Sequence, residues 1–279
     1  TKSKSMVTEV ADSPHLPDDL QGDFLIAGYF ARNIARLRPA VDGAGHKLKT
    51  LAPLLTSTHS AFRPVDLNVG PDGAIYVADW FNPIIGHYQA SFRHPDRDKK
   101  RGRIWRISAR GRPLDKPPAL ATMTAAELCK QLAAPTRWVS QQAKLRLMDL
   151  PKAETLAATR NWVKSLDASD PALEHKLYEA IGVFESHEEV NRPLLERLLN
   201  AKDHRARAYA TRVLGRWHDR LDKPLALLKQ RAADESPRVR LEALVAASDV
   251  RTASSIAVVA LAADGPADRF INFAFSQAV

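Results

Sequence analysis

The sequence predicts a mixed fold, in which β-strands occupy residues 1–115 and paired α-helices stacked as an α-solenoid occupy residues 116–279. Three observations support this division. Short apolar runs separated by turn residues fill the first part, as they do in antiparallel sheets. Apolar residues follow a helical spacing from Thr122 onward. Similar helix starts then recur along the second part, which is typical of helical repeats.

The strands of the first part are predicted from β-forming residue types and from alternation of apolar and polar side chains. Five are expected, at residues 23–29, 33–38, 65–69, 74–80 and 102–107. Asp42-Gly43 supplies a turn after the second strand. Gly70-Pro71-Asp72-Gly73 supplies another, because proline presets φ and glycine accepts positive φ.

Short antiparallel strands at this spacing, with a strand that ends in Ala78-Asp79-Trp80, predict blades of a β-propeller. A propeller closes its ring with about four to eight blades. Residues 1–115 supply too few strands for that, and isolated blades would leave long sheet edges open. We therefore interpret residues 1–115 as the C-terminal, incomplete part of a propeller and expect further blades upstream.

Residues 59–87 make this interpretation more specific. They read HSAFRPVDLNVGPDGAIYVADWFNPIIGH and are followed by FRHPDRD at residues 92–98 and GRIWRI at residues 102–107. The pattern closely resembles the end of the propeller in a family of membrane-bound dehydrogenases of planctomycetes and verrucomicrobia.

The resemblance implies an activity for a longer protein. Members of the family are distantly similar to soluble quinoprotein sugar dehydrogenases. They continue from the propeller into HEAT-like repeats and then into a c-type cytochrome domain that carries Cys-x-x-Cys-His. A quinone cofactor similar to PQQ, a c-type haem and a periplasmic or cell-envelope location are therefore expected for the full-length protein. No cofactor is expected within this chain alone.

The second part begins with a capping-box pattern, Thr124 followed by Glu127. Helix starts with Pro, Ser or Asp then recur, each followed by arginine and by a small residue within the helix. The recurring alanines are Ala143, Ala180, Ala210, Ala243 and Ala274. Such alanines allow close approach of neighbouring helices, and the pattern resembles HEAT repeats stacked as a solenoid. The last helix, at residues 269–275, is strongly apolar, so we expect the chain to continue.

Composition limits the possible functions. The hydrophobic fraction of 45% and the charged fraction of 26% are typical of a soluble globular protein. No apolar run approaches the ~18 residues of a membrane span, and no signal peptide is visible in this chain. Cys129 is the only cysteine, which excludes an intramolecular disulfide and a haem attachment motif within these residues. We expect Cys129 in the core.

The candidate site residues lie between His59 and His94. His87 and Asp79 are the predicted catalytic residues, and Arg63, Asp66 and Asn82 are predicted to bind a cofactor. By the resemblance, arginine pairs with cofactor carboxylates, histidine acts as general base and aspartate orients it. The alternative is structural, with Asp79 and Asn82 capping the turn after the strand and Arg63 bridging two blades. The spacing of His59, His87 and His94 matches no compact metal motif, so no metal is expected.

The net charge of +9 suggests a further alternative. Six arginines of the second part form a candidate basic stripe: Arg205, Arg207, Arg212, Arg216, Arg238 and Arg240. Such a stripe attracts nucleic acid, but in many HEAT-like repeats arginines at helix starts form a ladder with acidic residues of the neighbouring repeat. Asp203, Asp234 and Glu235 are placed for that ladder, and the sequence favours it.

Three hypotheses follow. The first is part of a dehydrogenase that oxidises a sugar or alcohol and passes electrons to a downstream haem domain, which docks on the helical repeats. The second is a non-catalytic HEAT-repeat module that binds another protein. The third is a helical repeat that binds nucleic acid, for which the sequence gives no clear signal.

Overall fold

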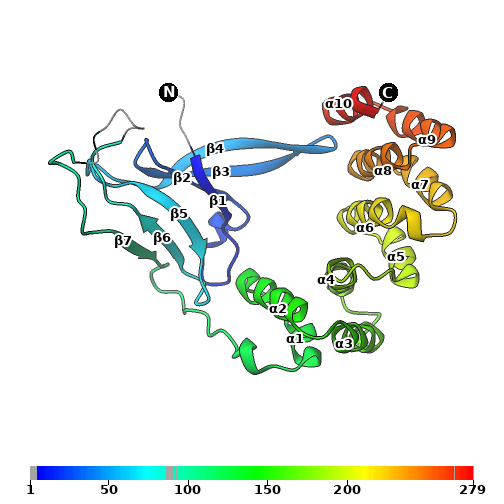
Figure 1. The fold of residues 1–279 in the computed structure, drawn as a ribbon, viewed down its shortest axis with the longest axis horizontal. Coiled ribbons are helices and arrows are strands. Elements are labelled where there is room, and N and C mark those ends of the chain that lie inside the picture. The colour runs from blue at the N-terminus through cyan, green and yellow to red at the C-terminus, as the bar shows by residue number, and fades with distance from the viewer. Residues whose placement is uncertain (1–4, 86–90, 92, 267, 279) are drawn as a thin grey trace. The chain divides into compact units, whose positions relative to one another are not determined.

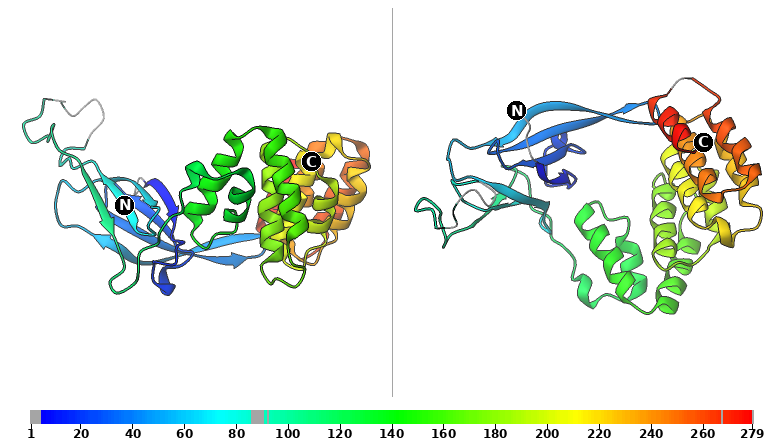
Figure 2. Two further views of the ribbon diagram at one scale, coloured as in Figure 1. Left: turned by 90° about the horizontal axis from the view of Figure 1, so that it is seen from below. Right: turned by 45° about the horizontal axis from the view of Figure 1, so that its top comes forward.

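The structure is a computed structural model that describes residues 5–85, 91, 93–266 and 268–278. The chain divides into two compact units. The β unit comprises residues 1–40, 47–118 and 135–140. The helical unit comprises residues 41–46, 119–134 and 141–279. Figures 1 and 2 show the strands and the helices of these units.

The β unit contains two sheets, and the strands of each follow one another in chain order (Figure 1). One sheet has the order β1-β2-β3-β4 and the other has the order β5-β6-β7. The strands are β1 (Ser5–Val10), β2 (Phe24–Gly28), β3 (Asn33–Asp42), β4 (Gly45–Thr56), β5 (Pro64–Val69), β6 (Ile75–Asp79) and β7 (Arg103–Ile107). The pairs β1–β2, β2–β3, β5–β6 and β6–β7 are antiparallel. Antiparallel sheets are thus confirmed for the first part of the chain, and these two sheets form no closed ring among the described residues.

Sequence reasoning found five of these strands and missed β1 and β4. Most side chains of β4 are exposed, so its sequence lacks the apolar alternation that marks a half-buried strand. It also contains Pro53, which argues against a central strand.

The predicted turn between β5 and β6 is confirmed. The Gly73 amide donates to the Gly70 carbonyl at 3.0 Å, and Gly73 has a φ of +79°. The Asp72 carboxylate accepts hydrogen bonds from the Ala74 amide at 3.1 Å and the Tyr76 hydroxyl at 2.9 Å. The turn residues therefore set the register of the hairpin.

Both sheets contribute to one apolar core. Strands β1 and β5 contact each other, and so do β2 and β5. The buried residues of this core are Ala11, Leu16, Leu20, Leu25, Ala27, Ile34, Leu67, Val69, Ile75 and Val77. Each large side chain among them contributes about 1.5–3 kcal/mol through its removal from water, so each sheet depends on the other for its stability.

The helical unit consists mostly of successive helices that pack against one another (Figure 1). The helices are α1 (Ala125–Gln131), α2 (Arg137–Asp149), α3 (Lys152–Ser165), α4 (Leu173–Ser186), α5 (Arg192–Leu199), α6 (His204–Arg216), α7 (Pro224–Ala232), α8 (Pro237–Val250), α9 (Ala253–Ala263) and α10 (Arg269–Ala278). Helices α4, α6, α8 and α10 contact one another in succession, and α7 and α9 contact each other in a second layer. None of the helices in the described part of the chain combines the length and apolar character needed to span a bilayer.

Details of the helical prediction are confirmed. Thr124 and Glu127 form the expected capping box at α1. Ala143, Ala180, Ala210 and Ala243 are fully buried, and Ala274 is half-buried. Cys129 is fully buried, and burial raises the pKa of its thiol, as befits a core residue.

We expect Gly73→Ala to destabilise the β unit by about 2–3 kcal/mol. A Cβ at this residue would lie 2.6 Å from Ser13 Oγ, 2.7 Å from Asp115 Oδ2 and 2.8 Å from His15 Cβ. Gly111→Ala is the matched control, because Gly111 has nearly the same φ, +78°, and nothing lies within 4 Å of its Cβ position. Chemical denaturation followed by tryptophan fluorescence measures both variants. Equal losses would contradict the steric explanation and leave only backbone strain of about 1–2 kcal/mol.

Candidate ligand-binding site

Three of the predicted site residues, Arg63, Asp79 and Asn82, lie together at the end of β6. The Asp79 side chain is buried, and its Oδ1 accepts hydrogen bonds from the Arg63 amide at 2.8 Å and the Phe81 amide at 3.0 Å. Its Oδ2 accepts from the Trp105 indole N–H at 3.1 Å. One carboxylate therefore joins the start of β5, the turn after β6 and strand β7.

The turn after β6 is fixed by its aromatic residue. Phe81 has a φ of +51°, which is unusual for a bulky side chain. The Arg103 guanidinium carbon lies 3.5 Å from the centre of its ring, and the His59 ring lies on it at a centroid distance of 5.4 Å. The buried Asn82 accepts a hydrogen bond from the Ile84 amide at 3.0 Å. Asp79 and Asn82 thus both cap backbone turns, as the structural alternative expected.

Arg63 carries a buried charge that the nearby Asp79 carboxylate favours but does not pair with. Its exposed fraction is 7%, and the guanidinium donates to the Phe62 carbonyl at 3.0 Å. Among the described residues its Nε has no acceptor, and the guanidinium forms no ion pair there. Burial, and then the nearby Arg32 charge, lower the pKa of Arg63 from its usual value. A buried cation with a free N–H favours an anionic group that supplies the acceptor.

Two aromatic rings stand beside this cation. Tyr29 stacks on Trp80 with ring centroids 6.0 Å apart and planes inclined by 17°. Burial raises the pKa of Tyr29, and the charges of Arg63 and Arg97 oppose that rise. Trp80 is 45% exposed, so a planar or sugar-like ligand has access to its ring.

Trp80 and Asn82 also line an open cavity of about 430 Å³ with the segment 97–101. That segment carries four cationic side chains and one carboxylate, Asp98. Backbone amides of Lys100 and Arg101 donate to Asp98 and lower its pKa. The cavity is therefore basic, which again favours an anionic ligand.

The other predicted residues do not join this group. Asp66 is exposed on β5, and its carboxylate accepts from the adjacent Leu67 amide at 2.9 Å. His87 lies outside the described residues. Within the described ranges no group of three His, Cys, Asp or Glu side chains is arranged to hold a metal ion.

Sequence reasoning missed Tyr29 and Arg32 as parts of this site. They belong to the loop between β2 and β3, in the other sheet from Arg63. Local periodicity does not indicate that Tyr29 and Arg32 lie near Arg63, because this proximity arises only when the two sheets pack together.

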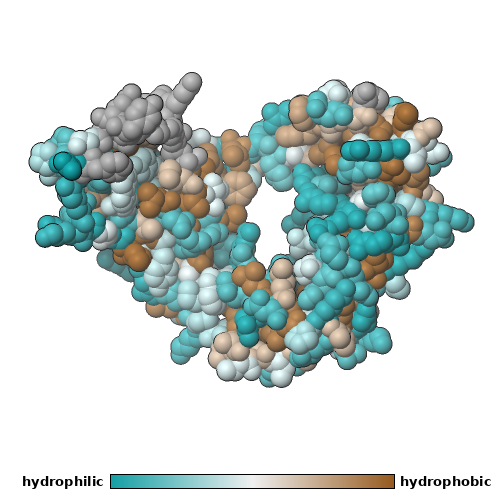
Figure 3. Space-filling view, in the orientation of Figure 1, coloured by the Kyte–Doolittle hydropathy of each residue, from teal (hydrophilic) through white to brown (hydrophobic). Residues whose placement is uncertain are grey.

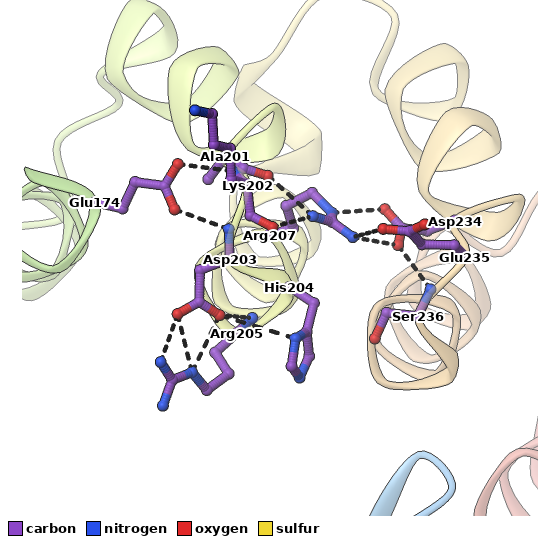
Figure 4. A network of polar contacts seen from close by, with 10 residues as sticks. All are labelled: Glu174, Ala201, Lys202, Asp203, His204, Arg205, Arg207, Asp234, Glu235 and Ser236. Atoms are coloured by element: carbon purple, nitrogen blue, oxygen red, sulfur yellow. Dashed lines mark hydrogen bonds and ion pairs between the residues drawn. The ribbon is translucent and has the colours of Figure 1, made fainter. Parts of the chain in front are cut away.

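The helical unit confirms the predicted arginine ladder (Figure 4). Arg207 is 8% exposed and binds Asp234 through two hydrogen bonds of 2.9 Å. It also donates to the carbonyls of Ala201 and Lys202 and lies 3.3 Å from Glu235. Asp203 has a different role, since it caps α6 and pairs with Arg205.

The other arginines of the candidate stripe are also paired. Arg212 and Arg238 both bind Glu242, at 2.7 Å and 3.2 Å. Arg216 binds Glu188, and Arg240 donates to the carbonyls of Asp234 and Glu235. The charge of the stripe is therefore largely compensated within the helical unit.

A groove of about 1320 Å³ follows helices α4, α6 and α8 of the helical unit, and residues 41–46 form part of its wall. The Tyr178 and Tyr209 rings lie 4.5 Å apart in it, and the Tyr209 hydroxyl donates to Glu185 at 2.5 Å. Burial and Glu185 raise the pKa of Tyr209. Hydrophilic side chains dominate the visible face over α4 and α6 (Figure 3).

Comparison with known protein families gives a structural class for the C-terminal part of the chain but only a domain of unknown function for the N-terminal part. Residues 191–278 match HEAT repeats. The C-terminal helices α5 to α10 are therefore similar to HEAT repeats. Residues 5–111 match a domain of unknown function, DUF7133, which coincides with the strands of the β unit. No curated protein and no solved structure matches the chain.

We expect Asp79→Ala to cost at least about 3 kcal/mol, because two buried amides and one indole N–H lose their acceptor. Asp79→Asn should cost less, since it retains one acceptor oxygen. Asp66→Ala is the control and should change stability by less than about 0.5 kcal/mol. Denaturation followed by tryptophan fluorescence measures all three. An Asp79→Ala variant as stable as the control would show that the carboxylate does not hold the site together.

Replacing Arg207 by Met should destabilise the helical unit by about 2–3 kcal/mol, because the nearly buried Asp234 loses its two hydrogen bonds from Arg207 and keeps only Arg231, at 3.6 Å, as a counter-ion. Arg205→Met, at a mostly exposed side chain, is the control. Urea denaturation followed by far-UV circular dichroism compares the two, and similar losses would argue against the ladder as a stabilising feature.

The same pair has a defined pH dependence. Burial alone would raise the pKa of Asp234, but hydrogen bonds from Arg207 and the Ser236 amide bring it below its usual 3.8. A lowered folded pKa means that the pair stabilises fully above about pH 4 and that this contribution is lost as pH falls further. The Arg207→Met variant should show a smaller acid-dependent loss of stability, because only the Ser236 amide and Arg231 then favour the charged carboxylate.

Proposed function

We propose that the chain is part of a dehydrogenase that oxidises a sugar or alcohol. In this proposal the β unit belongs to a β-propeller and binds an anionic, quinone-type cofactor, and the HEAT repeats dock an electron-accepting domain such as a c-type cytochrome. The family resemblance of residues 59–107 suggested this function, and features of the β unit support it.

The sheet arrangement is compatible with neighbouring propeller blades. Each sheet is an antiparallel meander in chain order, β1 and β5 contact each other, and the two sheets share one core. Propeller blades are antiparallel sheets of about four strands around a common axis. A closed ring would require further blades from outside residues 1–279.

The observation that carries the cofactor proposal is the buried Arg63 guanidinium. Burial of a charge costs free energy, so a buried arginine that forms no ion pair among the described residues favours a bound group that completes its hydrogen bonds. In this proposal a carboxylate of a planar cofactor supplies the acceptor that the buried Nε lacks, and the neighbouring Tyr29–Trp80 pair contacts the cofactor ring. Bound there, a quinone would supply the two-electron acceptor for alcohol oxidation.

Other residues receive distinct roles in the proposal. Arg63 and Asn82 bind the cofactor, and His87 serves as general base. Asp79 acts by positioning, because its carboxylate already accepts three hydrogen bonds. Asp66, with its carboxylate on the Leu67 amide, has no role at this site.

The alternative is a non-catalytic module whose HEAT repeats bind a protein. The groove along α4, α6 and α8, with its tyrosine pair and mixed charges, favours this reading. Nucleic-acid binding is less well supported, because the arginines of the stripe are paired with acidic residues or backbone carbonyls. Binding through that stripe would predict a steep loss of affinity with added salt.

The test uses the full-length protein and dye-linked oxidation of a panel of sugars and alcohols. Arg63→Met should weaken quinone binding by about 10- to 100-fold, as expected for loss of a charged hydrogen-bonding partner. Its folding stability should change by no more than about 1 kcal/mol, since the lost charge forms no ion pair among the described residues. Quenching of tryptophan fluorescence by the quinone measures binding directly.

Arg110→Met is the matched control, because Arg110 is exposed after β7. Equal quinone affinity in the two variants would refute the assignment of Arg63. A folded full-length protein that oxidises nothing in the panel would favour the protein-binding module instead.

A further inference from the structure

The helical unit includes a short turn that belongs to none of its helices. Residues 41–46, the tip of the β3–β4 hairpin, are part of this unit. Ala44 has an exposed fraction of 1%, and Gly45 is also buried. Hairpin tips are normally exposed to solvent and tolerate insertions and substitutions. The burial of this tip therefore requires a specific explanation.

Both backbone polar groups of Ala44 are bound by side chains. Its amide donates to Asp268 Oδ2 at 2.7 Å, and its carbonyl accepts from the Arg238 guanidinium at 3.2 Å. Asp268 is itself buried, and its other oxygen accepts from the amides of Phe270 and Ile271 at the start of α10. One buried carboxylate thus binds the helix start and the turn together.

The residues on either side of Ala44 must be small. A Cβ on Gly43 would lie 1.8 Å from Asp268 Oδ2, and Gly43 has a φ of +58°. A Cβ on Gly45 would lie 2.5–2.8 Å from the Phe270 ring. Asp42 adds an ion pair of 2.8 Å with Arg269. The site therefore recognises three features of the turn: the backbone amide and carbonyl of Ala44, the absence of side chains at Gly43 and Gly45, and the negative charge of Asp42.

We propose that Arg238 of α8 and Asp268–Phe270 at the start of α10 form a recognition site for a glycine-flanked tight turn, and that residues 42–45 are its ligand. The bound turn also supplies part of the wall of the groove along α4, α6 and α8. Release of the turn would open that side of the groove. This inference does not depend on the proposed dehydrogenase activity.

Hydrogen exchange of the whole chain tests the proposal. In the wild type the Ala44 amide should be protected, because its acceptor is a buried carboxylate. Gly45→Val should reduce that protection by at least about tenfold, because the Val side chain collides with the Phe270 ring. Exchange at core amides such as Leu195 and Val213 should stay unchanged, which shows that the repeats remain folded.

A double variant makes the test specific. Phe270→Ala removes the ring that Gly45→Val would strike, so the pair together should regain most of the lost protection. Val41→Ala, at an exposed position of the tip outside the proposed ligand residues 42–45, is the control and should leave exchange unchanged. If Gly45→Val prevents folding, Gly43→Ala replaces it. Unprotected Ala44 in the wild type, or no recovery in the double variant, would overturn the proposal.

Discussion

The carboxylate of Asp79 is the constraint on which the end of the β unit depends. It accepts hydrogen bonds from two buried amides and one partly buried indole N–H, which belong to three separate segments, so none of these donors is left unsatisfied. Its position fixes the backbone of Arg63, the left-handed turn at Phe81 and the indole of Trp105. The candidate ligand site is built on that arrangement, since Arg63 and Trp80 flank the same turn.

Two buried arginines, one in each unit, differ in how far the protein satisfies their hydrogen bonds and charge. Arg207 has a bidentate carboxylate partner and two carbonyl acceptors, so its charge is satisfied inside the protein. Arg63 has one carbonyl acceptor and an unpaired Nε among the described residues. The first arrangement is complete as a structural element. The second is incomplete, and for that reason it directs the functional proposal to the β unit.

Local patterns predicted the parts of the fold whose causes are local. The turn at Gly70–Gly73, the capping box at Thr124 and the buried alanines of the repeats follow from backbone preferences and helical spacing. The arginine ladder was also predictable, because arginines and acidic residues recur near the starts of successive helices, as Arg207 and Asp234 do. Strand β4 was not, since its exposed side chains leave no alternation. Within the site, Arg63, Asp79 and Asn82 are close in sequence, whereas Tyr29 and Arg32 join them only through sheet packing.

The burial of the β3–β4 tip has a practical consequence for protein engineering. Surface hairpins are the usual places for epitope tags, fluorophore-attachment cysteines or circular permutation. Between Gly43 and Gly45 the chain has no space for added atoms. In the loop after β7 the exposed Arg110 is the better choice for a label in the β unit, because Gly111 beside it has a φ of +78° that strains any substitution.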